Sequence, residues 1–215
     1  ERQNPISNSW RIVAFSSFSI AALCVVFGFF SNRLLLLSGD LVRVNYETLD
    51  SEIIGRIEGD PTNHPAYSPV IDMKFLPEGT GLVMTRGTFR GAPGMKGSVW
   101  LWDFTNQEFS RKTQSNFNDG FGDFSDNGEV MVFRSDREGS HDIFVQEGDQ
   151  ILNLTQSPDR ENFPAISRDG RKIVFSSDVN GLDVGEGIKT MDLYLCEKSE
   201  SGKWSSPKQL TFSEG

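Results

Sequence analysis

Residues 163–178 read FPAISRDGRKIVFSSD, and residues 121–136 read FGDFSDNGEVMVFRSD, 42 positions earlier and without a gap. Seven of these sixteen positions are identical, and all seven are turn-forming or core residue types. The identical pairs are Phe121/Phe163, Ser125/Ser167, Gly128/Gly170, Val132/Val174, Phe133/Phe175, Ser135/Ser177 and Asp136/Asp178. Self-similarity at a period of about 40 to 50 residues indicates an array of similar supersecondary units.

The match continues in both directions from this stretch. Asp142–Val145 corresponds to Asp192–Leu195, and Leu154-Thr155 corresponds to Leu210-Thr211. Between Asp178 and Asp192 the later copy is eight residues longer than the earlier one is between Asp136 and Asp142, in a segment that contains the Gly-rich stretch 181–187. A weaker copy lies upstream, where residues 75–79 align with 124–128 and residues 82–84 with 131–133, and its third segment is Val99–Asp103.

One unit has a simple physical plan. A short strand ends at a turn whose glycine supplies a positive φ, at Gly79, Gly128 and Gly170 in turn. A strongly apolar second strand follows, at residues 129–134 and 171–176. A polar hairpin, a third strand and a short fourth strand ending in Leu-Thr complete the unit. Four antiparallel strands every 42 to 50 residues predict an all-β chain of propeller blades, each of which needs a neighbour to bury its faces.

The sequence therefore predicts a partial β-propeller over residues 33–215, preceded by an apolar segment over residues 1–32. Three clear four-stranded blades are expected at about 66–113, 118–156 and 160–212. An incomplete fourth is expected at about 33–60, with strands at Arg33–Asp40, Leu41–Leu49 and Glu52–Ile57.

The repeat resembles the WD-like propeller repeat of TolB and its relatives. Residues 163–211 fit the family pattern closely, residues 121–155 fit it with Asp126-Asn127 in place of Pro-Asp, and residues 66–113 fit it loosely. The resemblance covers about two thirds of the chain. It implies about six or seven blades, so we expect a piece of a longer chain or an open array that a partner closes.

The resemblance implies a non-enzymatic module that binds a protein or a glycan through loops at one end of its blades. Similar blades occur in the propeller domains of prolyl-oligopeptidase-type peptidases, which is the alternative; the catalytic serine would then lie in a separate hydrolase domain. A polysaccharide-degrading propeller enzyme is a third interpretation, but it needs histidine metal ligands, and the chain has only His64 and His141.

Composition and motifs exclude other classes. The sequence has no Gly-x-Ser-x-Gly elbow, phosphate-binding loop or dinucleotide fingerprint, so we expect no catalytic residue and no cofactor. Cys24 and Cys196 are too few for a disulfide scaffold or a cysteine zinc site, and we interpret both as buried apolar residues. Residues 101–215 carry 12 basic and 21 acidic side chains, which argues against nucleic acid as a partner.

An apolar run near the start has two interpretations. Ile12–Phe30 contains 19 residues without a charge, just enough for a membrane-spanning helix. Arg2 and Arg11 ahead of it would hold the N-terminus in the cytoplasm and place the rest outside, in the periplasm, at the surface or in the medium. The alternative is a pair of buried strands, because Phe, Val and Ile are frequent and Gly28 can form a bend.

Several polar residues recur from blade to blade, and we expect them to serve the blade. Asp136 and Asp178 open the polar hairpin, where a carboxylate can accept backbone N–H groups in a local turn. Asp142 and Asp192 precede the third strand. Asn153 begins an Asn-Leu-Thr glycosylation sequon, but the recurring Leu-Thr already accounts for that sequence.

The remaining candidates concern ligands. Oxygen side chains crowd one Gly-rich loop and suggest a calcium site, although the spacing is not that of an EF-hand; they are Asp178, Asn180, Asp183 and Glu186. This loop and residues 87–97 are the expected partner-contact loops. The carboxylates of Asp119, Asp123 and Asp126 cluster near a strand that would line the central channel of a propeller; acid–base work by them is not favoured, because nothing fixes their separation. For the alternating Trp100 and Trp102, packing against the next blade is favoured over ligand stacking.

Overall fold

The computed structural model describes residues 10–16, 38–45, 48–58, 70–87, 96–113 and 116–213. Seventeen β-strands and one short 3₁₀ turn, η1 (Pro77–Gly79), form the regular structure of these residues. The predicted all-β class is confirmed. Strand formation is expected here because short runs rich in β-branched and aromatic residues alternate with turn residues.

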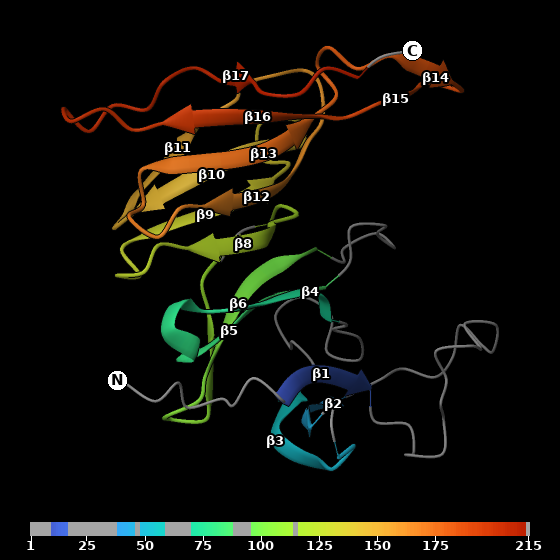
Figure 1. Ribbon diagram of the computed structural model, residues 1–215, viewed down its shortest axis with the longest axis vertical. Helices are drawn as coiled ribbons and strands as arrows, with labels where there is room; N and C mark the ends of the chain where they lie inside the picture. Colours follow the sequence, from blue (N-terminus) through green and yellow to red (C-terminus); the bar gives the residue numbers. More distant parts are fainter. Residues whose placement is uncertain are drawn as a thin grey trace. The chain divides into compact units, whose positions relative to one another are not determined.

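Three four-stranded sheets follow one another along the chain (Figure 1). The first blade consists of β4 (Val70–Phe75), β5 (Gly81–Arg86), β6 (Ser98–Asp103) and β7 (Glu108–Arg111). The second blade consists of β8 (Gly120–Phe124), β9 (Val130–Ser135), β10 (Asp142–Glu147) and β11 (Gln150–Asn153). The third blade consists of β12 (Glu161–Ile166), β13 (Lys172–Ser177), β16 (Asp192–Glu197) and β17 (Lys208–Gln209), and β14 (Asp183–Gly185) and β15 (Ile188–Lys189) form a hairpin inserted between its second and third strands.

A separate three-stranded antiparallel sheet precedes the blades in the sequence. It contains β1 (Trp10–Ser16), β2 (Ser38–Asn45) and β3 (Ser51–Glu58). The strand predicted at Glu52–Ile57 lies within β3. The predicted boundary between Asp40 and Leu41 is wrong, because β2 runs through it as one strand whose residues 38–44 pair along β3.

The apolar run of residues 12–30 is described only at its start. Ile12–Ser16 belong to β1 and pair with Gly39–Arg43 of β2, so these five residues adopt the strand alternative. Residues 17–30, with Cys24 and Gly28, lie outside the described residues. Within the described part of the chain, no helix is long and apolar enough to cross a membrane.

The first turn of each blade is built in the same way. Gly79, Gly128 and Gly170 have φ angles of 67°, 71° and 69°, a region that residues with a Cβ rarely adopt. In the second and third blades, the hydroxyls of Ser125 and Ser167 accept the N–H of the residue five positions on, at 3.0 and 2.9 Å. Serine and glycine therefore recur together because both close this turn.

Two apolar clusters join the three blades. Successive side chains of a strand point to opposite faces, so neighbouring residues of β9 meet different blades. Phe133 and Met131 pack with Val83 and Val99 of the first blade. Val132 and Val130 instead pack with a cluster that includes residues of the third blade, namely Ile173, Phe175, Tyr194 and Cys196. Cys196 is fully buried there, and burial raises the pKa of its thiol to about 11.

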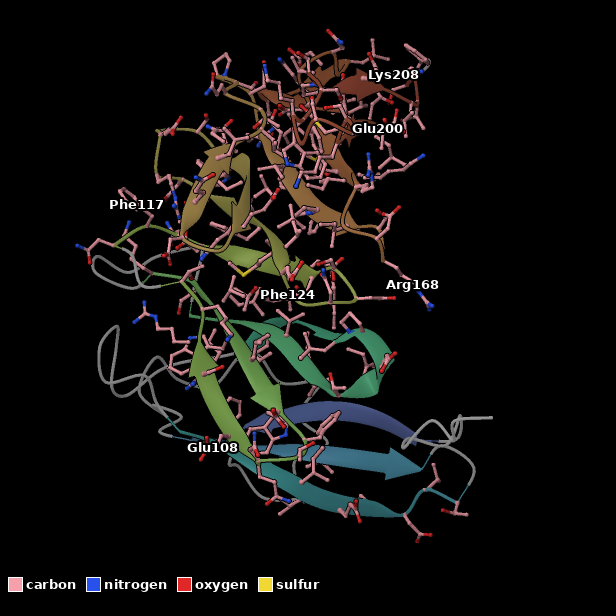
Figure 2. The ribbon with its side chains drawn as sticks, turned by 90° about the vertical axis from the view of Figure 1, so that its left-hand side faces the viewer. Glu108, Phe117, Phe124, Arg168, Glu200 and Lys208 are labelled. Carbon is pink, nitrogen blue, oxygen red and sulfur yellow. The ribbon has the colours of Figure 1, made fainter. Side chains whose placement is uncertain are left out.

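Polar groups also cross between the first strands of the blades. The Asp123 carboxylate on β8 accepts the Ile166 N–H of β12 at 3.1 Å. Lys74 Nζ on β4 donates to the Pro164 carbonyl at 3.0 Å and lies 3.8 Å from Asp123. The Asp126 N–H donates to the carbonyl of Arg168, which stands at the blade edge near the turn of the third blade (Figure 2).

Close approach of the first two blades requires a glycine at position 122. A Cβ there would lie 2.6 Å from Val99 Cγ1 and 3.2 Å from Val83 Cγ2. Phe124, two residues on, packs against the same cluster (Figure 2). The valine side chains therefore occupy the space that any larger residue would need.

We predict that Gly122→Ala lowers the free energy of unfolding by about 1–3 kcal/mol, because it overpacks this junction. Urea unfolding of the wild type, Gly122→Ala, Val99→Ala and the double variant measures the effect. In the double variant the smaller side chain at position 99 makes room, so its loss of stability is less than the sum of the single losses. Additive losses would contradict the proposed contact.

Candidate binding surface

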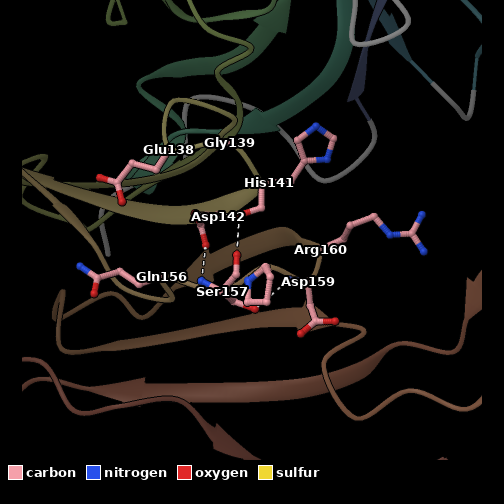
Figure 3. Close-up of a pocket in the computed structure, with 10 residues that line it drawn as sticks. Glu138, Gly139, His141, Asp142, Gln156, Ser157, Asp159 and Arg160 are labelled. Atoms are coloured by element: carbon pink, nitrogen blue, oxygen red, sulfur yellow. Dashed lines mark hydrogen bonds between the residues drawn. The ribbon is translucent and has the colours of Figure 1, made fainter.

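A cavity lined by polar side chains lies where two loops meet, one joining β9 to β10 and the other joining β11 to β12. The cavity has a volume of about 840 Å³. Glu138 and Gln156 lie on one side of it and His141 and Arg160 on the other (Figure 3). The other lining residues are Gly139, Ser140, Asp142, Ser157, Pro158 and Asp159.

Asp142, the first residue of β10, holds the two loops of this pocket together. It is 1% exposed, and its carboxylate accepts a hydrogen bond from Thr155 Oγ1 at 2.7 Å. It also accepts one from the Ser157 N–H at 3.0 Å (Figure 3). Ser140 Oγ and Asn153 Nδ2 also donate to it, at 3.2 and 3.1 Å. A buried carboxylate is stable only when it is bonded in this way.

The hydrogen bond from the threonine hydroxyl to the aspartate, which we call the Asp–Thr clamp, recurs in the third blade. This explains why Leu-Thr is part of the repeat. Asp192 accepts a hydrogen bond from Thr211 Oγ1 at 3.0 Å. Each threonine hydroxyl in turn accepts the N–H of the residue that follows the aspartate, Ile143 at 3.2 Å and Leu193 at 2.8 Å. The fourth strand is thereby tied to the start of the third.

Asp136 and Asp178 act over a longer range than the predicted local turn. Asp178 accepts the N–H of Arg160 and pairs with its guanidinium, both at 2.8 Å. Asp136 accepts the N–H and the side-chain amide of Asn118, at 2.8 and 2.6 Å. In both blades, the residue held lies 18 positions earlier and leads into the first strand.

The local turn is closed by the preceding serines instead. Ser135 Oγ accepts the N–H of Arg137 at 3.3 Å, and Ser177 Oγ accepts that of Val179 at 3.2 Å.

Burial alone would raise the pKa of Asp178, but the N–H and guanidinium of Arg160 outweigh it, so this pKa lies below its usual value. The Asp178 carboxylate therefore stabilises the blade through its bonds with Arg160.

The inserted hairpin β14–β15 projects beside the pocket and is joined to it by one ion pair. Lys189 Nζ on β15 lies 3.0 Å from Asp159, a residue of the pocket lining. Val184 and Ile188, at 64% and 54%, are among the most exposed aliphatic side chains in the described part of the chain. The hairpin therefore presents apolar side chains at the loop end of the third blade.

The calcium hypothesis for this loop is not supported. Asp178 is paired with Arg160, and Asn180 Nδ2 donates to Tyr194 Oη and Gln209 Oε1, at 3.2 and 2.9 Å. Asp183 accepts the N–H of Gly185 within its own turn. In the part of the chain that the structure describes, no group of three or more acidic, histidine or cysteine side chains is placed to hold a metal ion.

The other residues singled out from the sequence form packing contacts, ion pairs or hydrogen bonds within the fold, or lie exposed. Asp119, Asp123 and Asp126 do not converge: Asp119 pairs with Arg137 at 3.1 Å, Asp123 binds the third blade, and Asp126 is exposed. Trp102 is buried against Phe109, with ring centroids 4.4 Å apart. This arrangement makes no acid–base pair.

Asn153 is buried, and its Nδ2 donates to Glu138 and Asp142 at 2.8 and 3.1 Å, so the sequon nitrogen is occupied in the folded protein. His141 lines the pocket; burial, followed by nearby Arg134, lowers its pKa and favours a neutral ring. Of the other expected contact loop, residues 88–95 lie outside the described residues.

Sequence reasoning missed Glu161, which lies behind the pocket. The signal was in the repeat, because Glu161 stands 42 positions after Asp119; Glu161 begins β12, and Asp119 directly precedes the equivalent strand β8. It also missed the pocket itself, because the two loops that form it are brought together only by the folding of two blades.

Comparison with known proteins establishes the fold class. No protein-family model matches the sequence, and no curated protein sequence matches it. Among solved structures, TolB from Acinetobacter baumannii is similar with a TM-score of 0.50 at 18% identity, over 80% of this chain and 39% of that one. An oligogalacturonate lyase determined with manganese is similar with a TM-score of 0.53 at 15% identity, over 80% of this chain and 47% of that one.

A prolyl endopeptidase is also similar, with a TM-score of 0.50 at 9% identity, over 79% of this chain and 26% of that one. At such identities the likeness defines the fold. The chain has the TolB-like β-propeller fold that its repeat predicts. It spans less than half the length of each of these three proteins.

We predict that Asp142→Ala lowers the free energy of unfolding by about 3 kcal/mol or more, because it leaves several buried donors without an acceptor. Urea unfolding measures the loss. Asp149→Ala, on the exposed turn after β10, is the matched control and changes stability by no more than about 0.5 kcal/mol. Equal effects of the two substitutions would contradict the clamp.

Proposed function

We propose that this chain is a non-enzymatic binding module that recognises a protein through the loop end of its second and third blades. The observation that carries the proposal is the exposed apolar hairpin β14–β15, fixed beside the polar pocket by the Lys189–Asp159 ion pair. Insertions on a rigid β-scaffold commonly supply binding surface.

The chemistry of this surface favours a protein over a glycan. Val184 and Ile188 are aliphatic, whereas sugar rings are best stacked on aromatic faces. Asp183 and Glu186 lie on the same hairpin, and residues 101–215 carry an excess of nine acidic groups. A partner that presents aliphatic and basic side chains complements this surface.

A second function is supported by the similarity to a prolyl endopeptidase. In that case, the blades would belong to a serine peptidase whose catalytic domain lies elsewhere in a longer chain. Labelling of the protein from its native source with a fluorophosphonate probe distinguishes the two proposals. Covalent labelling of a species that contains this sequence supports the peptidase, and its absence supports the binding module.

We also propose a location outside the cytoplasm, on the basis of the apolar residues 12–30 and the TolB-like fold. Cell fractionation followed by alkaline extraction tests it. Recovery outside the cytoplasm supports the proposal, and retention in the extracted membrane would further indicate an anchor. Recovery only with cytoplasmic proteins would overturn it.

We predict that Val184→Asp combined with Ile188→Asp weakens partner binding about tenfold or more, because aliphatic anchors contribute most when they are buried at an interface. Binding is measured on arrays of immobilised basic-aliphatic peptides, acidic peptides and glycans.

The matched control is Ile151→Asp with Leu152→Asp, which changes two exposed aliphatic residues on β11. The control retains the wild-type binding. Equal losses in both double variants would contradict a role for the hairpin, and selective retention on glycans would replace the protein partner by a carbohydrate.

A further inference from the structure

Glu161 is a buried carboxyl group between the second and third blades. It begins β12 and is 1% exposed. Its N–H donates to the His141 carbonyl at 2.8 Å, and its Oε1 accepts a hydrogen bond from Ser177 Oγ at 2.9 Å. Within the described part of the chain, Oε2 has no hydrogen-bond partner.

The second blade shows how the same position is normally satisfied. Asp119 stands 42 residues earlier and is 0% exposed. The guanidinium of Arg137 reaches it at 3.1 Å. That guanidinium also lies over the rings of Phe133 and Phe144, at 5.0 and 4.8 Å from their centroids. The carboxylate is therefore neutralised by a cation held between aromatic rings.

The third blade keeps the carboxyl group and the rings but not the cation. Phe175 and Tyr194 stack with centroids 5.9 Å apart, the same separation as for Phe133 and Phe144. The residue at the position of Arg137 is Val179. The arginine is replaced at the point where the inserted hairpin segment begins.

Among the residues that the structure describes, no cation forms an ion pair with Glu161, and the buried Arg134 guanidinium nearby binds Asn162. The hydroxyls of Ser177, Ser157 and Thr155 favour the ionised form of Glu161 and lower its pKa, whereas burial and the nearby Asp142 raise it, and burial dominates. Thr155 donates its proton to Asp142, at 2.7 Å. The adjacent Arg160 is paired with Asp178, and the Lys189 ammonium is paired with Asp159. His141 is favoured as a neutral ring.

We propose that Glu161 is a proton-operated latch between the second and third blades. In its protonated form it fits the buried site. In its ionised form it places an uncompensated charge behind Asp142 and Ser157, and so loosens the inner wall of the pocket. The proposal concerns this chain's own packing and stands whether or not the pocket binds the proposed partner.

The expected pH dependence has a definite sign. Burial, together with Asp142, raises the pKa of Glu161 to about 7, whereas an exposed glutamate titrates near 4.5. Between these values the folded state holds a proton that the unfolded state releases. Stability therefore falls as the pH rises through this window, and the unfolding constant rises by up to about 300-fold between a pH well below 4.5 and a pH well above 7.

The test is urea unfolding of the full chain between pH 4.5 and pH 8 in four forms: wild type, Glu161→Gln, Val179→Arg and Asp119→Asn. Glu161→Gln mimics the protonated acid, so at pH 8 its unfolding constant is lower than that of the wild type, by up to about 300-fold. Val179→Arg supplies the missing cation and likewise reduces the loss of stability toward pH 8.

Asp119→Asn is the matched control in the second blade. It leaves the buried Arg137 without its carboxylate, so it destabilises the protein at pH 8, opposite to Glu161→Gln. A wild type and Glu161→Gln with the same pH dependence would overturn the proposal.

Carboxyl-carbon NMR of wild-type protein labelled at glutamate provides a second measurement that needs no variant to fold. One glutamate resonance titrating near pH 7, and absent from that range in Val179→Arg, supports the latch. Titration of every glutamate near pH 4.5 overturns it.

Discussion

The central strand β9 of the second blade has two apolar faces, and each face is covered by a different neighbouring blade. In β9, Phe133 packs toward the first blade and Val132 toward the third. Because adjacent residues of a strand point in opposite directions, neither set can be buried by one sheet alone. The same residue types recur 42 positions apart because neighbouring blades must offer similar packing faces to each other.

The polar residues of the repeat hold in place the loops at the ends of the strands. Asp178 and Asp136 hold the entry into the first strand, and Asp142 and Asp192 hold the exit from the fourth. Each of these carboxylates is engaged by hydrogen bonds within its own blade or its connecting loops. Their recurrence therefore reflects the scaffold, and a binding surface has to be sought where the repeats differ.

The third blade differs from the second in the loop between its second and third strands, and three features meet there. The loop is longer and forms the hairpin β14–β15, its Lys189 pairs with the pocket residue Asp159, and Val179 replaces the arginine that neutralises the buried carboxylate in the second blade. The inserted hairpin and the buried Glu161 carboxyl group thus both adjoin the same pocket. This divergence links the proposed partner surface to the proposed response to pH.

The sequence by itself determined the all-β class, the blade repeat and the turn glycines, because these depend on strand periodicity and local backbone geometry. It did not determine which carboxylates bind which partners: Asp178 reaches Arg160 across 18 residues, and the loop oxygens expected for calcium are dispersed. Only the tertiary structure brought two loops together into a pocket and buried Glu161 without a cation. Those properties arise from contacts between blades, and they depend on burial and long-range distance, which no local pattern of residues encodes.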